Sequence, residues 1–208
     1  MRRVFLHGLG QTGEGWREAI VKLQTAKHCI CPDLANILQG KEATYQNLYE
    51  AVSAICDQTE EQIDLCGLSL GGVLALNYAI ERPEKVHSLA LIAPQYKMPK
   101  TMLRVQNFLF RFMPKSAFQQ MGFEKEAFIR LCKTMMNLDF SDSLSKITCP
   151  ALVICGEKDR ANKKAAGKLA GILANAELRE IPGAGHEVNL DAPEKLSEAL
   201  GRFYHRAG

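Results

Sequence analysis

Residues 63–72 read Ile-Asp-Leu-Cys-Gly-Leu-Ser-Leu-Gly-Gly, and this stretch decides the fold. The run Ile63–Cys66 is typical of a short buried strand. Over Leu70–Arg82, apolar residues recur at helical spacing, and Pro83 ends the pattern. Ser69 therefore lies at a tight turn from strand to helix, with a glycine two residues before it and another two residues after it. Bulkier side chains at those two places would clash in so sharp a turn.

Ser69 has the setting of a nucleophile elbow, in which a G-x-S-x-G sequence follows a strand and opens a helix. The strained turn exposes the serine hydroxyl at the edge of the sheet. Free N–H groups at the helix N-terminus lie beside it and can stabilise negative charge. We therefore expect a nucleophile at Ser69 with an oxyanion site next to it.

Apolar runs and helical patterns alternate along the chain, which predicts an α/β fold with a doubly wound, mostly parallel sheet of about six strands. The predicted strands are Val4–Leu6, Cys29–Cys31, Ile63–Cys66, Val86–Ile92, Ala151–Cys155 and Leu178–Ile181. The predicted helices cover about Glu14–Thr25, Thr44–Gln58, Leu70–Arg82, Lys163–Leu173 and Pro193–Arg206.

This alternation breaks between Gln95 and Ser145, where two or more inserted helices are predicted. We expect a single domain over residues 1–208, with a core of residues 1–94 and 146–208 and a short helical lid of about residues 95–145. Between Lys97 and Phe123 the lid carries five basic residues and no acidic one. We interpret these charges as a solvated face over an apolar one. A site for an anionic ligand such as acyl-CoA, or for a membrane surface, is the alternative.

Composition narrows the class of protein. Of the 208 residues, 47% are hydrophobic and 24% charged, as in ordinary globular domains. A net charge of +3, without a basic run interleaved with aromatics, argues against nucleic-acid binding.

The seven cysteines lack metal-site spacing and suggest reduced thiols in the cytoplasm. The apolar stretch near Met1 is too short for a signal peptide, and we expect no integral membrane association. The oligomeric state stays open.

Two later residues supply the partners that a serine nucleophile needs. A serine hydroxyl is a weak nucleophile until a base takes its proton, and where such an elbow occurs the acid and then the histidine follow the serine along the chain. Asp159 comes after Ala151–Cys155, and His186 comes after Leu178–Ile181. Because groups after parallel strands gather at one edge, we expect them to meet Ser69 there, with the histidine as base and the aspartate orienting it.

Each of these partners has an alternative interpretation. Asp159 could serve only as the N-cap of the following helix, and Glu157, Asp139 and Asp142 are competing carboxylates. We favour Asp159 because it lies in the loop where this arrangement places the acid. His186 alone could be an ordinary loop histidine, but the other four histidines lack comparable placement.

The expected oxyanion site uses two backbone N–H groups. Leu70, directly after the serine, supplies one, and the turn after the first strand supplies the other, which we assign to Leu9. We expect His7 to fix that turn through hydrogen bonds rather than to act as a second base. Trp16 and Tyr96 are candidates for lining the substrate pocket, although single aromatics near loops are as often packing residues.

With these motifs together, the chain resembles the α/β-hydrolase superfamily, and within it the small microbial esterase, enol-lactonase and carboxylesterase-like branch. The motifs that carry the resemblance are His7–Gly10, Gly67–Gly72, Gly156–Asp159 and Gly183–His186, which run in family order. Two features depart from the family pattern. The antiparallel hairpin usual at the N-terminal edge of the sheet is absent, and the short lid implies a more open pocket.

The resemblance implies hydrolysis of an ester, thioester, lactone or related bond, with neither a metal nor an organic cofactor. Serine at the elbow separates the chain from the haloalkane dehalogenase branch, which has aspartate there. We expect a serine hydrolase that cleaves a small carboxylic ester or thioester through an acyl-serine intermediate. The alternatives are a lactone or carbon–carbon bond hydrolase with the same triad, and a ligand-binding homologue without catalysis.

Overall fold

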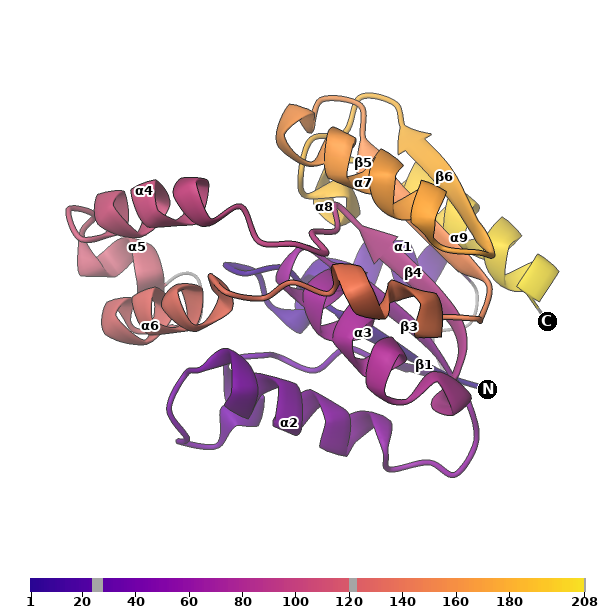
Figure 1. Cartoon of the computed structure of the whole chain (residues 1–208), viewed down its shortest axis with the longest axis horizontal. Coiled ribbons are helices and arrows are strands. Elements are labelled where there is room, and N and C mark those ends of the chain that lie inside the picture. Colours follow the sequence, from indigo (N-terminus) through magenta and orange to yellow (C-terminus); the bar gives the residue numbers. More distant parts are fainter. Residues whose placement is uncertain (24–27, 120–122, 208) are drawn as a thin grey trace.

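A six-stranded parallel sheet in the order β2-β1-β3-β4-β5-β6 forms the centre of the structure (Figure 1). The computed structural model describes residues 1–23, 28–119 and 123–207. Its strands are β1 (Arg2–Leu6), β2 (Cys29–Ile30), β3 (Ile63–Leu68), β4 (Val86–Ile92), β5 (Ala151–Gly156) and β6 (Ala176–Ile181). All five pairings between neighbours are parallel, which confirms the predicted doubly wound sheet. From β1 the chain first adds β2 on one side and then returns to add β3 to β6 on the other side. The loops after β1 and β3 therefore leave the carboxyl edge in opposite directions.

Helices cover both faces of this sheet (Figure 1). The helices of the core are α1 (Arg17–Lys22), α2 (Tyr45–Cys56), α3 (Leu70–Glu81), α7 (Arg160–Ile172), α8 (Val188–Asp191) and α9 (Pro193–Ala207). Short 3₁₀ segments are η1 (Gly13–Trp16), η3 (Asn36–Leu38), η4 (Pro83–Lys85) and η5 (Ser141–Lys146). Between β4 and β5 lies the insertion, made of α4 (Lys100–Phe110), α5 (Lys115–Gln119) and α6 (Lys125–Met135).

Several element boundaries differ by one to three residues from those predicted, and three of these differences have local reasons. The predicted helix Glu14–Thr25 begins as a 3₁₀ turn, since glycines weaken the first turn, and its predicted end lies outside the described residues. β2 ends before Cys31 because the following Pro32 cannot donate to a ladder. α7 starts three residues early because the Asp159 side chain caps it.

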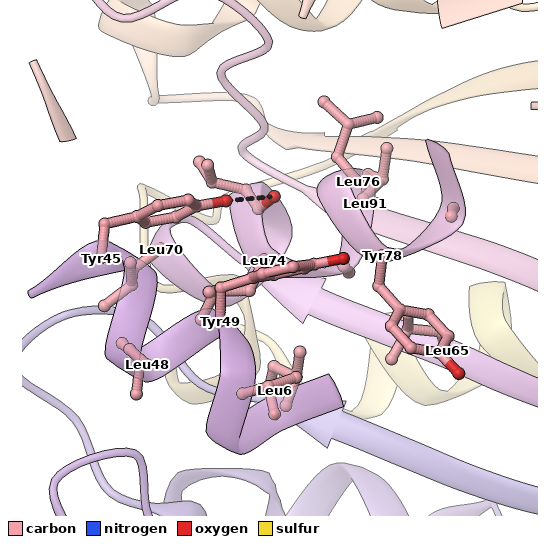
Figure 2. Packing of buried hydrophobic residues seen from close by; sticks show 14 of the residues in the cluster. Leu6, Tyr45, Leu48, Tyr49, Leu65, Leu70, Leu74, Leu76, Tyr78 and Leu91 are labelled. Carbon is pink, nitrogen blue, oxygen red and sulfur yellow. Dashed lines mark hydrogen bonds between the residues drawn. The ribbon is translucent and has the colours of Figure 1, made fainter. Parts of the chain in front are cut away.

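The sheet separates two hydrophobic clusters because alternate strand residues point to opposite faces. In β1, Val4 and Leu6 belong to the larger cluster and Phe5 to the smaller one. The larger cluster joins the sheet to α2, α3 and α7, whereas the smaller joins it to α1 and α9. Figure 2 shows part of the larger cluster, in which the Tyr45 hydroxyl donates to the Val73 carbonyl at 3.5 Å.

α3, the helix that follows Ser69, is buried along nearly its whole length. Every residue from Leu70 to Ile80 is buried. A helix that is apolar on all sides belongs in the core of a protein. The N-terminus of α3 is thus held rigidly at the edge of the sheet.

The insertion projects from one edge of the sheet (Figure 1). Its interior is aromatic: the ring centroids of Phe110 and Phe128 are 5.1 Å apart, and Phe118 contacts both rings edge to face. α6 also contacts α2, which ties the insertion to the core. Among the described residues, no helix has the length and apolar character that crossing a bilayer requires.

Candidate active site

Ser69 occupies a strained turn between β3 and α3. Its backbone angles, φ 51° and ψ −112°, lie where residues other than glycine are rare, at a cost of about 1–3 kcal/mol. The Ser69 N–H donates to the Ile92 carbonyl at 2.9 Å, which holds the turn against β4. A Cβ added at Gly67 would collide with the Gly71 carbonyl, and one added at Gly71 with the Leu6 carbonyl. Both flanking glycines are therefore required by close backbone approach.

His186 and Asp159 form a hydrogen-bonded pair on the loops after β6 and β5. His186 Nδ1 lies 2.8 Å from Asp159 Oδ2. A carboxylate only accepts hydrogen bonds, so Nδ1 carries the proton and donates it, which leaves Nε2 free to act as a base. The Asp159 side chain is 4% exposed and that of His186 is 43% exposed. The carboxylate is thus buried beneath an imidazole that reaches solvent.

Asn162 and Gln95 extend this pair into a longer network. Asn162 Nδ2 donates to Asp159 Oδ1 at 2.9 Å and to Oδ2 at 2.8 Å. The same nitrogen lies 3.1 Å from His186 Nδ1. Asn162 Oδ1 in turn accepts from Gln95 Nε2 at 2.6 Å. The Asp159 carboxylate therefore has donors on both oxygens.

The sequence prediction missed Asn162 and Gln95, although each has a recognisable position. Asn162 is the third residue after the capping aspartate of α7, and its backbone N–H donates to Asp159 Oδ1 at 3.3 Å. Gln95 follows the carboxyl end of β4, at the same edge of the sheet. A polar side chain at each of these two positions, next to the predicted site, was the sequence signal that could have indicated the network.

His7 fixes the turn after β1. The Leu34 N–H donates to His7 Nε2 at 2.9 Å, so this ring nitrogen is unprotonated. His7 Nδ1 then carries the proton and donates to the Gly8 carbonyl at 2.8 Å. Burial lowers the pKa of His7, which is 1% exposed, below its usual 6.5. A neutral imidazole with both nitrogens bonded suits a structural role.

One cavity of about 510 Å³ brings the predicted site residues together. Among the described residues, those that line the cavity include Leu9, Ser69, Leu70, Asp159 and His186. Leu70 is the first residue of α3, and such an N–H has no acceptor within its own helix. The remaining walls are mostly apolar and come largely from the insertion and α3: Val73, Met98, Pro99, Leu103, Phe110, Phe128, Cys132 and Met135.

The structure places the two aromatic pocket candidates elsewhere. Trp16 is fully buried in the smaller cluster, with its ring centroid 5.3 Å from that of Phe5, because η1 turns toward the face covered by α1 and α9. Tyr96 is half-buried against the larger cluster, and its carbonyl accepts the Phe140 N–H at 2.8 Å. Neither is among the described residues that line the cavity.

Within the described ranges, none of the competing carboxylates forms a hydrogen bond or ion pair with His186, and two of them have other partners. Glu157 accepts the N–H of Gly183 at 2.7 Å. Asp139 pairs with Lys97 Nζ at 2.8 Å, which lowers the pKa of Asp139 to about 2. Asp142 lies in the first turn of η5. In the part of the chain that the structure describes, no three His, Cys, Asp or Glu side chains gather as a metal site would need.

A doubly wound parallel sheet, with a strained serine and a histidine–carboxylate pair at its carboxyl edge, has the architecture of the α/β hydrolases. A family model described as the alpha/beta hydrolase family matches residues 4–199, and the chain belongs to this family.

Several similar proteins are named as hydrolases. The chain is 22% identical to monoacylglycerol lipase abhd6-A of Xenopus laevis, over 96% of this chain and 74% of that protein. It is 23% identical to (E)-2-((N-methylformamido)methylene)succinate hydrolase of Acinetobacter baylyi, over 95% of this chain and 88% of that protein. A thermophilic esterase structure from Thermogutta terrifontis superposes with a TM-score of 0.82 at 20% identity, covering 100% of this chain and 90% of the other. These similarities support a hydrolase and leave its substrate open.

Proposed function

We propose that this protein is a serine hydrolase that cleaves a small carboxylic ester or thioester through an acyl-serine intermediate. The observation that carries the proposal is the strained Ser69 in the same cavity as the His186–Asp159 pair. A mainly apolar cavity of about 510 Å³ suits the acyl part of a small substrate. The insertion would act as the lid over that cavity.

In the proposed reaction, His186 Nε2 accepts the Ser69 hydroxyl proton while Oγ attacks the carbonyl carbon. The N–H groups of Leu70 and Leu9 would donate to the oxyanion that forms, an interaction whose loss typically costs about 3–4 kcal/mol of transition-state stabilisation. The imidazolium then protonates the departing alcohol or thiol, leaving an acyl-serine. Water, deprotonated by the same nitrogen, attacks this intermediate, and the imidazolium returns the proton to Ser69 Oγ as the acid is released. Asp159 orients the imidazole and stabilises its charged form throughout.

A fluorophosphonate probe tests the nucleophile directly. We expect the probe to label the wild-type protein at Ser69 and to leave Ser69→Ala unlabelled. An unlabelled wild type whose circular dichroism shows it to be folded would contradict the proposal. A panel of p-nitrophenyl esters, lactones and acyl-CoA thioesters, with Ser69→Ala as the blank, then identifies the class of bond. Labelling without turnover of any substrate would favour a ligand-binding homologue. A cytoplasmic location stays a prediction from the sequence.

A further inference from the structure

The outer side of α4 carries large apolar side chains in contact with solvent. Val105, Phe108, Leu109 and Phe112 follow one another at i, i+3, i+4 and i+7, which places them on one side of the helix and its last turn. Their exposed fractions are 56%, 57%, 57% and 74%. The rings of Phe108 and Phe112 contact each other edge to face, with centroids 5.2 Å apart. We call these four residues the exposed apolar face.

This face is not required to close the cavity, because another side of α4 does so. Leu103, Gln106 and Phe110 line the cavity. Phe110 also packs against the aromatic interior of the insertion. Figure 1 shows α4 along the side of the insertion that is farther from α2, with α6 between the two helices. The helix thus has one apolar side turned inward and a second turned outward.

A row of positive charge flanks the exposed apolar face. Lys100, Arg104 and Arg111 are spaced at i, i+4 and i+11, which puts them on one flank of α4 and its continuation. All three are exposed, and no ion pair with another described residue joins any of them. We call these three residues the basic row.

Of the residues that the structure describes, the carboxylates that pair with lysines and arginines of the insertion and its flanks do not pair with the basic row. Asp139 pairs with Lys97 at 2.8 Å, and Glu126 lies 3.6 Å from Lys115. Both partnered lysines lie outside α4. The sequence contains no acidic residue between Lys97 and Phe123. Positive charge is therefore concentrated beside the exposed apolar face.

We propose that the exposed apolar face and the basic row dock on an anionic lipid bilayer surface. A helix with aromatic and aliphatic residues on one side and Lys and Arg beside them lies in the membrane interface, where its apolar side enters the boundary between headgroups and acyl chains. Anionic lipids attract the neighbouring cations. A two-fold contact between copies would instead pair this surface with itself, and residues 97–123 contain no acidic side chain to offer the partner's basic row. Docking on a bilayer does not depend on the proposed reaction.

Vesicle flotation of the whole chain tests this surface. Vesicles of phosphatidylcholine alone are compared with vesicles of equal parts phosphatidylcholine and phosphatidylglycerol. We expect binding only to the anionic vesicles, and we expect added salt to weaken it. Arg104→Gln with Arg111→Gln should weaken binding by roughly 25-fold, about fivefold for each charge. Phe112→Ser should weaken it on the order of tenfold or more, because this ring would no longer enter the bilayer.

Matched variants elsewhere control for general changes in charge and hydrophobicity. Lys164→Gln with Lys168→Gln removes the same charge from exposed positions of α7, and Ile172→Ser removes an apolar side chain that is 50% exposed. We expect both controls to bind anionic vesicles like the wild type.

Three results would overturn the inference. The first is no binding of the wild type to anionic vesicles. The second is equal loss of binding in the α7 controls. The third is a wild-type dimer in sedimentation that Phe112→Ser dissociates, without vesicle binding, because the face would then join two copies of the chain.

Discussion

At the scale of single residues, Asp159 joins the two loops that carry the acid and the base. Its Oδ1 accepts the Asn162 N–H at the start of α7, and its Oδ2 accepts the His186 ring N–H. Capping a helix and orienting a histidine are thus performed by one carboxylate, through different oxygens. The Asn162 side chain donates to both of these oxygens and so holds the carboxylate in the plane that suits both contacts.

Asn162→Leu should therefore impair both stability and the proposed reaction. A buried carboxylate that loses a donor costs about 1–3 kcal/mol, so the free energy of unfolding should fall by that amount. With Asp159 less firmly held, kcat should fall on the order of tenfold or more. Chemical denaturation and ester turnover measure the two effects.

Asn175→Leu is the matched control, since Asn175 is an exposed asparagine whose amide donates to the Thr148 carbonyl. It should change the free energy of unfolding by no more than about 0.5 kcal/mol. If Asn162→Leu behaves like this control in both assays, the amide does not support the carboxylate.

His7 should make stability depend on pH. Its pKa in the folded protein lies below 6.5, its usual value, because burial opposes the charged form. Below pH 6.5 the unfolded chain therefore binds a proton that the folded chain resists, and the free energy of unfolding falls as the pH falls. His7→Asn cannot titrate, so this part of the slope should disappear in the variant. Denaturation of both proteins on each side of pH 6.5 gives the comparison, and identical slopes would contradict the role of His7.

At the scale of elements, the insertion contains a polar group that opposes its packing. The Asn107 side chain on α4 is buried, at 6% exposure, and neither its nitrogen nor its oxygen bonds to a described residue. Such an amide costs about 1–3 kcal/mol relative to a satisfied or apolar group. Asn107→Leu, which is similar in size, should therefore make the insertion more stable.

Limited proteolysis of the insertion and the thermal midpoint measure this change. Asn137→Leu, at an exposed position after α6, is the matched control and should be nearly neutral. Faster cleavage of Asn107→Leu than of the wild type would mean that the amide stabilises the insertion.

The elements themselves were largely predictable because their signals are local. The continuous apolar runs of the buried strands and the Gly67-to-Gly71 turn are each written in a few consecutive residues. The cavity walls were not predictable in the same way. Whether Trp16 or Phe110 lines a cavity depends on how distant elements pack, and the residues next to each in the sequence do not encode that packing. The Asn162 network likewise depends on two loops meeting.

At the scale of the whole molecule, the sheet is shared by both hydrophobic clusters. Each strand contributes alternate residues to the two faces, so neither cluster can lose its packing while the strands between them stay intact. We therefore expect the core to unfold as one unit, in keeping with the single domain predicted from the sequence.

Leu74→Ala and Leu200→Ala test this coupling from opposite faces. Both leucines are fully buried, Leu74 in the larger cluster and Leu200 in the smaller one, and each truncation should cost about 2–5 kcal/mol. Trp16 is the only tryptophan of the chain and lies in the smaller cluster, so its fluorescence reports unfolding on that face. If the two faces unfold together, Leu74→Ala should shift the fluorescence transition as far as it shifts the circular dichroism transition. Leu178→Ala is the control, at a site 53% exposed, and should shift both transitions much less. A fluorescence transition that responds to Leu200→Ala but not to Leu74→Ala would mean that the two faces unfold separately.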